Sequence, residues 1–232
     1  MRGLVLLLVA SACGRLGFET APADAPAVEP CAHLFCDSFE DPALPLWDGA
    51  TIDVGSTIAR DAMFGRSGAS LHALGDIGDS VAAQFVDVFP AAPPTDERVR
   101  VYIFTAAASD LNVEPLSISN PGRNNQIVFS LYTDSVDIHA HGMAGGFNVT
   151  RQTPPPRDRW VCYELHVVIG AAGEVELFED GVLAAVKAGI DTRPPAGDLS
   201  RVLLGITSKD PATLEDLWFD DVAADTAPIG CN

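Results

Sequence analysis

The sequence has few basic residues and few aromatic ones. Its 14 Lys and Arg stand against 32 Asp and Glu, which gives a formal charge of −18, and only 7% of its residues are Phe, Trp or Tyr. Nucleic acid phosphates and anionic lipid headgroups repel so negative a chain, so we expect neither as a partner. At 232 residues and 47% hydrophobic, the chain is long and apolar enough to build a sizeable core, which excludes wholesale disorder.

A long apolar run is also lacking. The apolar stretch near the N-terminus covers only residues 4–10 and follows a single Arg2, whereas a transmembrane helix needs about 20 apolar residues. So short a run is typical of a secretory signal. The next residues, 10–13 (ASAC), resemble a bacterial lipobox, and the resemblance implies that residues 1–12 are removed and that Cys13 carries a lipid anchor. An ordinary signal peptide that leaves this cysteine unmodified is the alternative.

Two further features of the N-terminal region bear on location. Gly14 follows the lipobox, and the resemblance implies sorting to the outer membrane because retention signals usually place Asp there. Residues 13–30 contain three prolines and no apolar periodicity, which predicts a flexible tether of about 50 Å if it is extended like polyproline. Residues 31–232 then form the folded domain. We expect a protein of the bacterial cell envelope, either an outer-membrane lipoprotein or a cell-surface protein, that contacts a membrane only through its N-terminal lipid.

Helix-period patterns are absent from this domain, and short runs of alternating apolar residues take their place. Val99, Val101 and Ile103, for example, alternate with polar residues and share one face of a strand. Gly, Pro, Asn and Asp interrupt such runs every 8 to 12 residues or so, which is typical of an antiparallel sandwich. Asp180-Gly181, between two runs, predicts a tight hairpin. The predicted strands are 36–40, 68–74, 80–88, 98–104, 115–119, 126–132, 135–141, 160–169, 174–178, 182–186, 201–207 and 217–224.

Six segments stand in a characteristic order along the domain. They are Phe39-Glu40-Asp41, Trp47-Asp48-Gly49, residues 65–72 (GRSGASLH), residues 160–164 (WVCYE), residues 175–181 (VELFEDG) and residues 217–222 (LWFDDV). Together they resemble the concanavalin A-like lectin/glucanase superfamily in its LamG-like form. The resemblance implies an all-β fold, an antiparallel two-sheet jelly-roll sandwich in which the first strand pairs with the last. It also implies a concave face, which binds sugar chains in many relatives.

The five cysteines include no Cys-x-x-Cys pair, and their scattered positions argue against a zinc site. If one cysteine is the lipid anchor, the remaining four predict two disulfides in an exported chain. The pairing of first and last strands that the resemblance implies brings Cys31 near Cys231 and leaves Cys36 to pair with Cys162. A local Cys31–Cys36 bridge is the main alternative.

The resemblance also implies a structural calcium ion. In many members of the superfamily, the loop of the first strand and an Asp of the last strand hold calcium, and Asp220 occupies the matching position. Asp41, Asp48 and the carbonyl of Gly49 complete the predicted set of oxygen ligands. Acidic residues are concentrated in these regions, so a cation would relieve their repulsion. A surface that is merely acidic is the alternative.

Glu174, Glu176 and Glu179 have the spacing with which laminarinase-type glycosidases of this superfamily arrange their nucleophile and acid, with carboxyl groups about 5 Å apart. In those enzymes the catalytic strand precedes the strand that begins with Trp. Here the glutamates follow Trp160 and lead into Asp180-Gly181. We therefore interpret them as the polar face of a hairpin strand and name no catalytic residue.

Polar side chains on three predicted strands form the candidate ligand-binding face. If they all belong to the concave sheet, they suit hydrogen bonding and stacking with sugars, or proton abstraction from a uronate, as in the polysaccharide lyases of this fold. The lyase motif is incomplete, because Val128 and not His follows Gln126-Ile127. His139 and His141 are also candidate metal ligands, and ordinary solvent-facing residues are the alternative. The predicted ligand-binding residues are Arg98, Arg100, Tyr102, His139, His141, Glu164 and His166.

The sequence therefore predicts a surface-anchored lipoprotein whose jelly-roll domain binds carbohydrate or another cell-surface polymer without catalysing a reaction. Two alternatives stay open. One is a polysaccharide-degrading enzyme, a lyase or a glycoside hydrolase, that acts on the concave face. The other is a calcium-braced structural or adhesion scaffold. With only three Trp and three Tyr, a binding surface of exposed aromatic rings is not expected to be large.

Overall fold

The computed structural model describes residues 31–76, 81–89, 95–107, 111–209 and 214–231. The predicted signal segment 1–12, Cys13 and the tether 13–30 lie outside the described residues. Residues from Cys31 onward form one compact unit. Nowhere in the described ranges is there a helix with the length and apolar character needed to cross a membrane.

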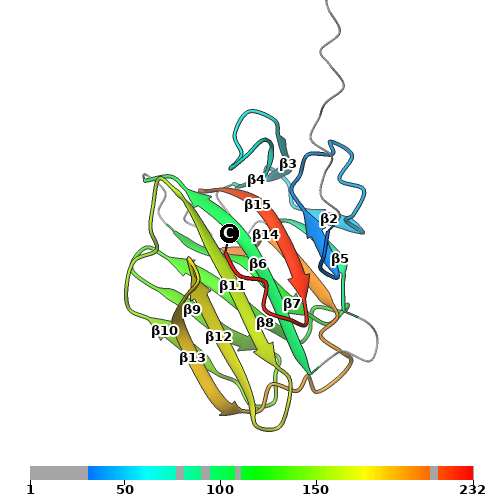
Figure 1. Ribbon diagram of the computed structural model, residues 1–232, viewed down its shortest axis with the longest axis vertical. Helices are drawn as coiled ribbons and strands as arrows, with labels where there is room; N and C mark the ends of the chain where they lie inside the picture. The colour runs from blue at the N-terminus through cyan, green and yellow to red at the C-terminus, as the bar shows by residue number, and fades with distance from the viewer. Residues whose placement is uncertain (1–30, 77–80, 90–94, 108–110, 210–213, 232) are drawn as a thin grey trace, which may run out of the picture. The chain divides into compact units, whose positions relative to one another are not determined.

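Two antiparallel sheets face each other across a common core (Figure 1). Sheet A has the order β13-β12-β11-β6-β15-β4-β3, with β1 also paired to β15, and sheet B has the order β10-β9-β8-β7-β14-β5-β2. The strands of sheet A are β1 (Phe35–Asp37), β3 (Thr57–Asp61), β4 (Ser70–Gly75), β6 (Asp96–Thr105), β11 (Trp160–Val168), β12 (Gly173–Glu179), β13 (Val182–Ile190) and β15 (Glu215–Asp225). The strands of sheet B are β2 (Gly49–Ile52), β5 (Ala82–Asp87), β7 (Asn112–Ser119), β8 (Gln126–Tyr132), β9 (Val136–His141), β10 (Asn148–Arg151) and β14 (Arg201–Lys209).

The alternation of apolar residues determines which side of each strand meets the other sheet. Val99, Val101 and Ile103 on β6 are at most 1% exposed and lie in the core, as do Ile127 and Phe129 on β8. The residues between them point to the outer face of their sheet because side chains alternate along a strand. Each sheet therefore has an inner face in the core and an outer face, and functional side chains can occupy either outer face.

All twelve predicted strands correspond to strands of the structure, and the hairpin at Asp180-Gly181 is confirmed. Both turn residues have positive φ, 49° and 78°, the conformation that a two-residue type I′ turn requires and that Asp-Gly favours. Three strands were not predicted: β2, β3 and β10. They have only four or five residues each, and they lie at sheet edges, so they show too little alternation to be recognised.

The predicted pairing of the first and last strands is confirmed, because β1 runs antiparallel to β15 with Phe35 opposite Ala224. The disulfide pairing deduced from it is wrong. The structure joins Cys31 to Cys36 and Cys162 to Cys231. The predicted Cys31–Cys231 and Cys36–Cys162 bridges are both absent.

Strand order explains why the predicted bridges cannot form. Cys36 lies on β1 and Cys162 on β11, and β15 and β6 lie between those strands. Three interstrand spacings of about 4.8 Å each exceed the Cα separation of about 7 Å that a disulfide tolerates. The chain after β15 also turns back, and its end lies over β6 and β11 (Figure 1). That turn carries Cys231 to Cys162 and leaves Cys31 to close a local loop.

Candidate functional site

A row of aromatic side chains crosses the outer face of sheet A at one end. Trp160 on β11 is directly opposite Phe104 on β6, which is opposite Trp218 on β15, which is opposite His72 on β4. All four residues are partly exposed. The ring centroid of Phe104 lies 5.8 Å from that of Trp160 and 5.9 Å from that of Trp218. The imidazole of His72 stacks on Trp218 with a centroid distance of 4.5 Å. Four adjacent strands therefore present one continuous aromatic row.

Phe64, from the loop between β3 and β4, lies against this row. Its ring centroid is 4.8 Å from that of Phe104, 5.1 Å from that of Trp218 and 5.9 Å from that of Trp160. The Phe64 side chain is itself 37% exposed, and its neighbour Met63 is 92% exposed. We call Phe64, Phe104, Trp160, Trp218 and His72 the aromatic platform. Such a set of partly exposed rings is the kind of surface patch that marks a binding site.

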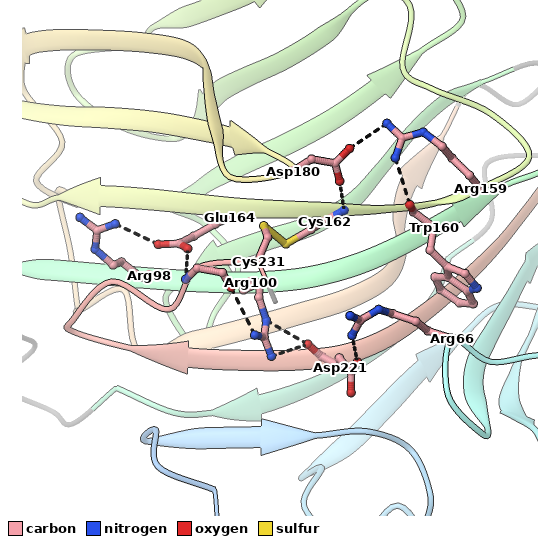
Figure 2. The surroundings of a disulfide bond; sticks show 11 residues. Arg66, Arg98, Arg100, Arg159, Trp160, Cys162, Glu164, Asp180, Asp221 and Cys231 are labelled. Carbon is pink, nitrogen blue, oxygen red and sulfur yellow. Dashed lines mark hydrogen bonds and ion pairs between the residues drawn. A yellow bond between two sulfur atoms is a disulfide. The ribbon is translucent and has the colours of Figure 1, made fainter.

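Polar groups surround the aromatic platform. The indole N–H of Trp218 donates to Asp61 Oδ2 at 3.2 Å, and Arg159 bonds both the Trp160 carbonyl and Asp180 Oδ2 (Figure 2). The first bond orients the Trp218 indole, and the Arg159 bonds place a guanidinium group beside Trp160. The platform therefore combines apolar ring faces with hydrogen-bonding groups at its edge.

Sequence reasoning did not identify the platform, although the signal was present. Trp160 has the same strand parity as Glu164 and His166, which alternation already placed opposite the apolar face. Trp218 likewise alternates with the core residues Leu217 and Phe219. Because side chains two residues apart share a face of a strand, alternation alone would have placed both indoles on the outer face.

Five of the seven predicted ligand-binding residues lie further along the same outer face. Arg98, Arg100 and Tyr102 are on β6, and Glu164 and His166 are on β11, where Glu164 is opposite Arg100 and His166 is opposite Arg98. Arg98 Nη1 donates to Glu164 Oε1 at 2.9 Å (Figure 2). Glu164, His166 and Tyr102 are only 4%, 6% and 6% exposed. These side chains are held by partners within the protein.

Those partners include the C-terminal segment, residues 226–231, which follows β15. Gly230 donates its backbone N–H to Glu164 Oε2 at 2.7 Å, and Arg100 Nη1 donates to the Gly230 carbonyl at 3.3 Å. Arg100 also donates to the carbonyl of Asp221 (Figure 2). A pocket of about 310 Å³ remains beside this segment, lined by Arg98, Glu164, Phe178, Gly181, Pro228 and Gly230. The segment covers much of the charged centre of sheet A.

The other two predicted residues lie on the opposite sheet. His139 and His141 occupy the outer face of β9 in sheet B, close to Glu114 from β7. The expectation that all seven residues share one concave face is therefore wrong, because β6 and β11 belong to sheet A. Sequence reasoning missed Glu114, which lies beside Pro115 at an irregular point of the β7–β8 pairing. Irregular pairing of this kind re-aims side chains and is not visible in a two-residue period.

Burial and the two neighbouring histidines shift the pKa of Glu114 in opposite directions. Burial of its side chain favours the neutral carboxyl, but the hydrogen bonds and charges of His139 and His141 outweigh it and lower the pKa of Glu114. His139 Nδ1 also lies 3.4 Å from Ser130 Oγ, and Ser130 is hydrogen-bonded to Tyr132. Burial raises the pKa of Tyr132. A connected polar network thus lies on the outer face of sheet B.

The predicted calcium ligands do not come together as a set. Asp48 and Gly49 adjoin β5 in sheet B, where Asp48 Oδ2 accepts the N–H of Asp87. Asp41 Oδ1 accepts the N–H of Ala43 at an exposed turn. Within the described ranges, Asp41, Asp48 and Asp220 do not belong to any group of three convergent Asp, Glu, His or Cys side chains.

Asp220 fits a cation site better than its predicted partners do. Its carboxylate is 1% exposed and accepts the N–H groups of Arg66 and Asp221 at 2.7 Å each. Burial, together with the charges of Asp221 and Glu40, raises the pKa of Asp220 to about 6 despite these hydrogen bonds. The acidic neighbour from the first loop is therefore Glu40 and not Asp41 or Asp48.

Glu174 and Glu176 lie on the outer face of β12, opposite the core residues Val175 and Leu177. Glu176 accepts a hydrogen bond from His166, and Glu179 accepts one from Arg151. The placement of Glu174 and Glu176 agrees with their interpretation as the polar face of a hairpin strand. For Glu179 that interpretation is wrong. It has the strand parity of the core residues Val175 and Leu177, and its side chain bonds Arg151 of sheet B and the core residue Tyr163.

No protein-family model and no curated protein matches the chain, but solved structures do. The chain is similar to Cip1, a cellulose-induced protein, with a TM-score of 0.65 and 18% identity, covering 85% of this chain and 100% of that one. The fold is therefore an all-β, antiparallel two-sheet jelly-roll sandwich. It is also similar to an endo-β-1,4-glucuronan lyase from the fungus Trichoderma reesei, with a TM-score of 0.63 and 12% identity, over 83% of this chain and 95% of that one. Alginate lyase vAL-1 from a Chlorella virus matches with a TM-score of 0.55 and 10% identity, over 78% of this chain and 93% of that one.

Proposed function

We propose that this chain is a lipoprotein of the bacterial surface whose jelly-roll domain binds carbohydrate, or a cell-surface polymer of similar chemistry, without cleaving it. The observation that carries this proposal is the aromatic platform on sheet A. Similarity to a cellulose-induced protein and to enzymes named for glucuronan and alginate supports a glycan as the partner.

The chemistry of the platform suits a sugar chain. A pyranose ring has an apolar face of C–H groups that packs against an aromatic ring, and its hydroxyl groups then need hydrogen-bond partners at the edge. Trp160 and Trp218 supply ring faces on either side of Phe104. Asp61 and Arg159 supply carboxylate and guanidinium groups beside them. A row across four strands favours an extended polymer over a single sugar.

A glycan array run with the domain lacking residues 1–30 tests this proposal. The expected result is binding to one class of polysaccharide that Trp160→Ala and Trp218→Ala each weaken. Phe85→Ala, which removes an aromatic ring from sheet B, is the matched control and is expected to bind normally. Absence of binding to any polysaccharide would refute the proposal and leave the scaffold alternative.

A second candidate function is a polysaccharide lyase that uses the outer face of sheet B. The observation that favours it is the chain of contacts from His139 through Ser130 to Tyr132, with Gln126 on the same strand as Tyr132. In a β-elimination, one member of the His139 and Tyr132 pair removes the proton next to a uronate carboxylate, and the other member protonates the leaving oxygen. The product contains a conjugated double bond, so ultraviolet absorbance with uronate polymers tests this candidate. Turnover lost in both His139→Ala and Tyr132→Phe would favour the lyase over the binding domain.

Anchoring at Cys13 is a separate part of the proposal and has its own test. Metabolic labelling with a fatty acid is expected to mark the chain, and Cys13→Ser is expected to abolish the label. An unlabelled wild-type chain would instead support ordinary signal-peptide cleavage.

A further inference from the structure

We propose that Glu114, His139 and His141 bind a divalent transition-metal ion of the zinc class on the outer face of sheet B. This inference is independent of glycan binding at the aromatic platform, because none of the three residues belongs to it. It does share His139 with the lyase candidate on sheet B.

The three donor atoms form a nearly equilateral triangle. His139 Nε2 lies 3.0 Å from His141 Nε2 and 3.2 Å from Glu114 Oε1, and His141 Nε2 lies 3.3 Å from Glu114 Oε1. Zinc bonds of about 2.0–2.1 Å in a tetrahedron put neighbouring ligand atoms about 3.3 Å apart. The triangle therefore has the size of one face of a tetrahedral zinc site. Among the described residues, this is the one group of His, Cys, Asp or Glu side chains that converges in this way.

A metal ion explains the contacts better than hydrogen bonding does. A neutral imidazole has a single N–H, and His139 Nε2 is within 3.2 Å of both an imidazole nitrogen and a carboxylate oxygen. If both histidines were protonated, two positive rings would meet at 3.0 Å. The two rings are also nearly perpendicular, at 85°. Two neutral imidazoles and one carboxylate pointing their lone pairs at a common ion satisfy all three donor atoms at once.

The fold positions these ligands on β9 and β7, the two neighbours of β8. His139 and His141 are two residues apart on β9, so alternation puts both on one face. Glu114 is on β7, and β8 lies between β7 and β9. Ser130 of β8, whose side chain is small, lies under the gap, and the irregular pairing of β7 with β8 near Glu114 directs its carboxylate toward the histidines.

The surroundings match those of a metal ligand set. His139 Nδ1 lies 3.4 Å from Ser130 Oγ, and an outer-shell partner on the second ring nitrogen is what metal-bound histidines usually have. Asp137, two residues before His139 on the same face, is 7% exposed, and its Oδ1 has no hydrogen-bond partner among the described residues. An unpartnered buried oxygen thus lies on the strand face that carries both histidines.

Ligand chemistry and exposure define the kind of site. Two imidazoles with one carboxylate suit zinc and its transition-metal neighbours, whereas calcium prefers six to eight oxygen ligands. The side chains of Glu114 and His139 are 18% and 14% exposed, but that of His141 is 53% exposed. The ion would therefore be open to solvent on the His141 side, with a coordination position left for water or an exogenous oxygen ligand.

The test is metal binding by the untagged full chain in a Cys13→Ser background, so that no thiolate outside the two disulfides contributes. Zn²⁺ and Co²⁺ are titrated by calorimetry, and the Co²⁺ absorption spectrum reports the coordination geometry. We expect one ion per chain with a tetrahedral Co²⁺ spectrum, and little response to Ca²⁺ at this site. Failure to bind Zn²⁺ or Co²⁺ would overturn the proposal.

Variants locate the ion. His139→Ala combined with His141→Ala is expected to abolish the high-affinity site, and Glu114→Gln to weaken it by more than the roughly 10- to 100-fold that loss of an outer-shell partner costs. His33→Ala removes a histidine that pairs with a carboxylate elsewhere, Asp225, and is the matched control with unchanged affinity. If circular dichroism shows that the double variant is unfolded, the metal affinity of Glu114→Gln tests the proposal by itself. Equal affinity in Glu114→Gln and wild type would overturn the proposal.

Discussion

Gly230 donates its backbone N–H to Glu164 Oε2 at 2.7 Å across 66 positions of sequence. The neighbouring residue, Cys231, is bonded to Cys162 on the same strand, β11. Glu164 also pairs with Arg98, and its side chain is only 5% exposed. The C-terminal segment is therefore attached to the outer face of sheet A by a disulfide, a hydrogen bond and, through Arg100, a carbonyl contact.

Removing the Cys162–Cys231 bridge is expected to destabilise the domain more than removing the Cys31–Cys36 bridge. The first bridge spans 69 positions and the second only 5. Loop-closure entropy alone gives about 4 kcal/mol for the long loop and about 2 kcal/mol for the short one. Urea unfolding of Cys162→Ala with Cys231→Ala, against Cys31→Ala with Cys36→Ala, measures the difference. Equal losses in the free energy of unfolding would show that the Cys162–Cys231 bridge does not constrain the unfolded chain more than the short one does.

Glu97 is expected to make the domain less stable as the pH rises. It is fully buried on β6, and neither carboxylate oxygen has a hydrogen-bond partner among the described residues. Burial, with the charges of Asp198 and Asp96, raises the pKa of Glu97 to about 9. Between its ordinary pKa of 4.5 and the raised value of about 9, the unfolded chain loses this proton while the folded protein keeps it. Stability therefore falls through this window, because the folded state binds more protons.

Glu97→Gln is expected to remove this part of the pH dependence. Each pKa unit corresponds to about 1.36 kcal/mol, so the stabilisation by Gln is near zero at pH 5 and reaches a few kcal/mol at pH 8. Thermal unfolding across this range measures it. Glu174→Gln, which removes one carboxylate from the outer face of the same sheet, shows how much charge alone contributes. A stabilisation that does not grow with pH would contradict a neutral Glu97.

Calcium is expected to stabilise the domain through Asp220 and not through Asp48. Asp220 is buried beside Glu40 and Asp221, whose charges it must tolerate, and a cation would relieve this repulsion. Millimolar calcium is expected to raise the melting temperature of the wild type, and Asp220→Asn to abolish the rise. Asp48→Asn is the matched control, because Asp48 adjoins sheet B. An unchanged wild-type melting temperature would exclude calcium as a structural ligand.

Strand alternation made an antiparallel sandwich and most of its strands predictable, and the superfamily resemblance implied the jelly roll. Alternation could not assign strands to sheets. His139 and His166 have the same outward parity in the sequence, yet β9 belongs to sheet B and β11 to sheet A. Parity separates inside from outside and says nothing about which of two outer faces a side chain occupies. The return of residues 226–231 over sheet A was equally unpredictable, since that segment has no periodicity. The unpredicted return of the C-terminal segment made the disulfide pairing wrong, and the unassigned sheets made the single binding face wrong.

Gly142→Ala is expected to lower both stability and the affinity for zinc. Gly142 follows His141 directly, with φ at 65°, and a Cβ there would lie 1.8 Å from the carbonyl oxygen of Asn124. The left-handed conformation costs a side chain about 1 to 2 kcal/mol, and the clash must also displace the turn or the end of β9. Because His141 is the neighbouring residue, such a displacement would distort the triangle of donor atoms.

Gly146→Ala is the matched control for this last prediction. Gly146 lies in the following loop, where a Cβ would meet nothing within 4 Å and φ is not in the left-handed range. A compatible Gly-to-Ala change stabilises by about 0.4 to 1 kcal/mol through the unfolded chain, so this variant is expected to unfold no earlier than the wild type and to bind zinc equally well. Urea unfolding and zinc titration of both variants measure the contrast. A Gly142→Ala variant that is destabilised but binds zinc normally would show that His141 is not a ligand, because the ligand adjoining the clash could not keep its position.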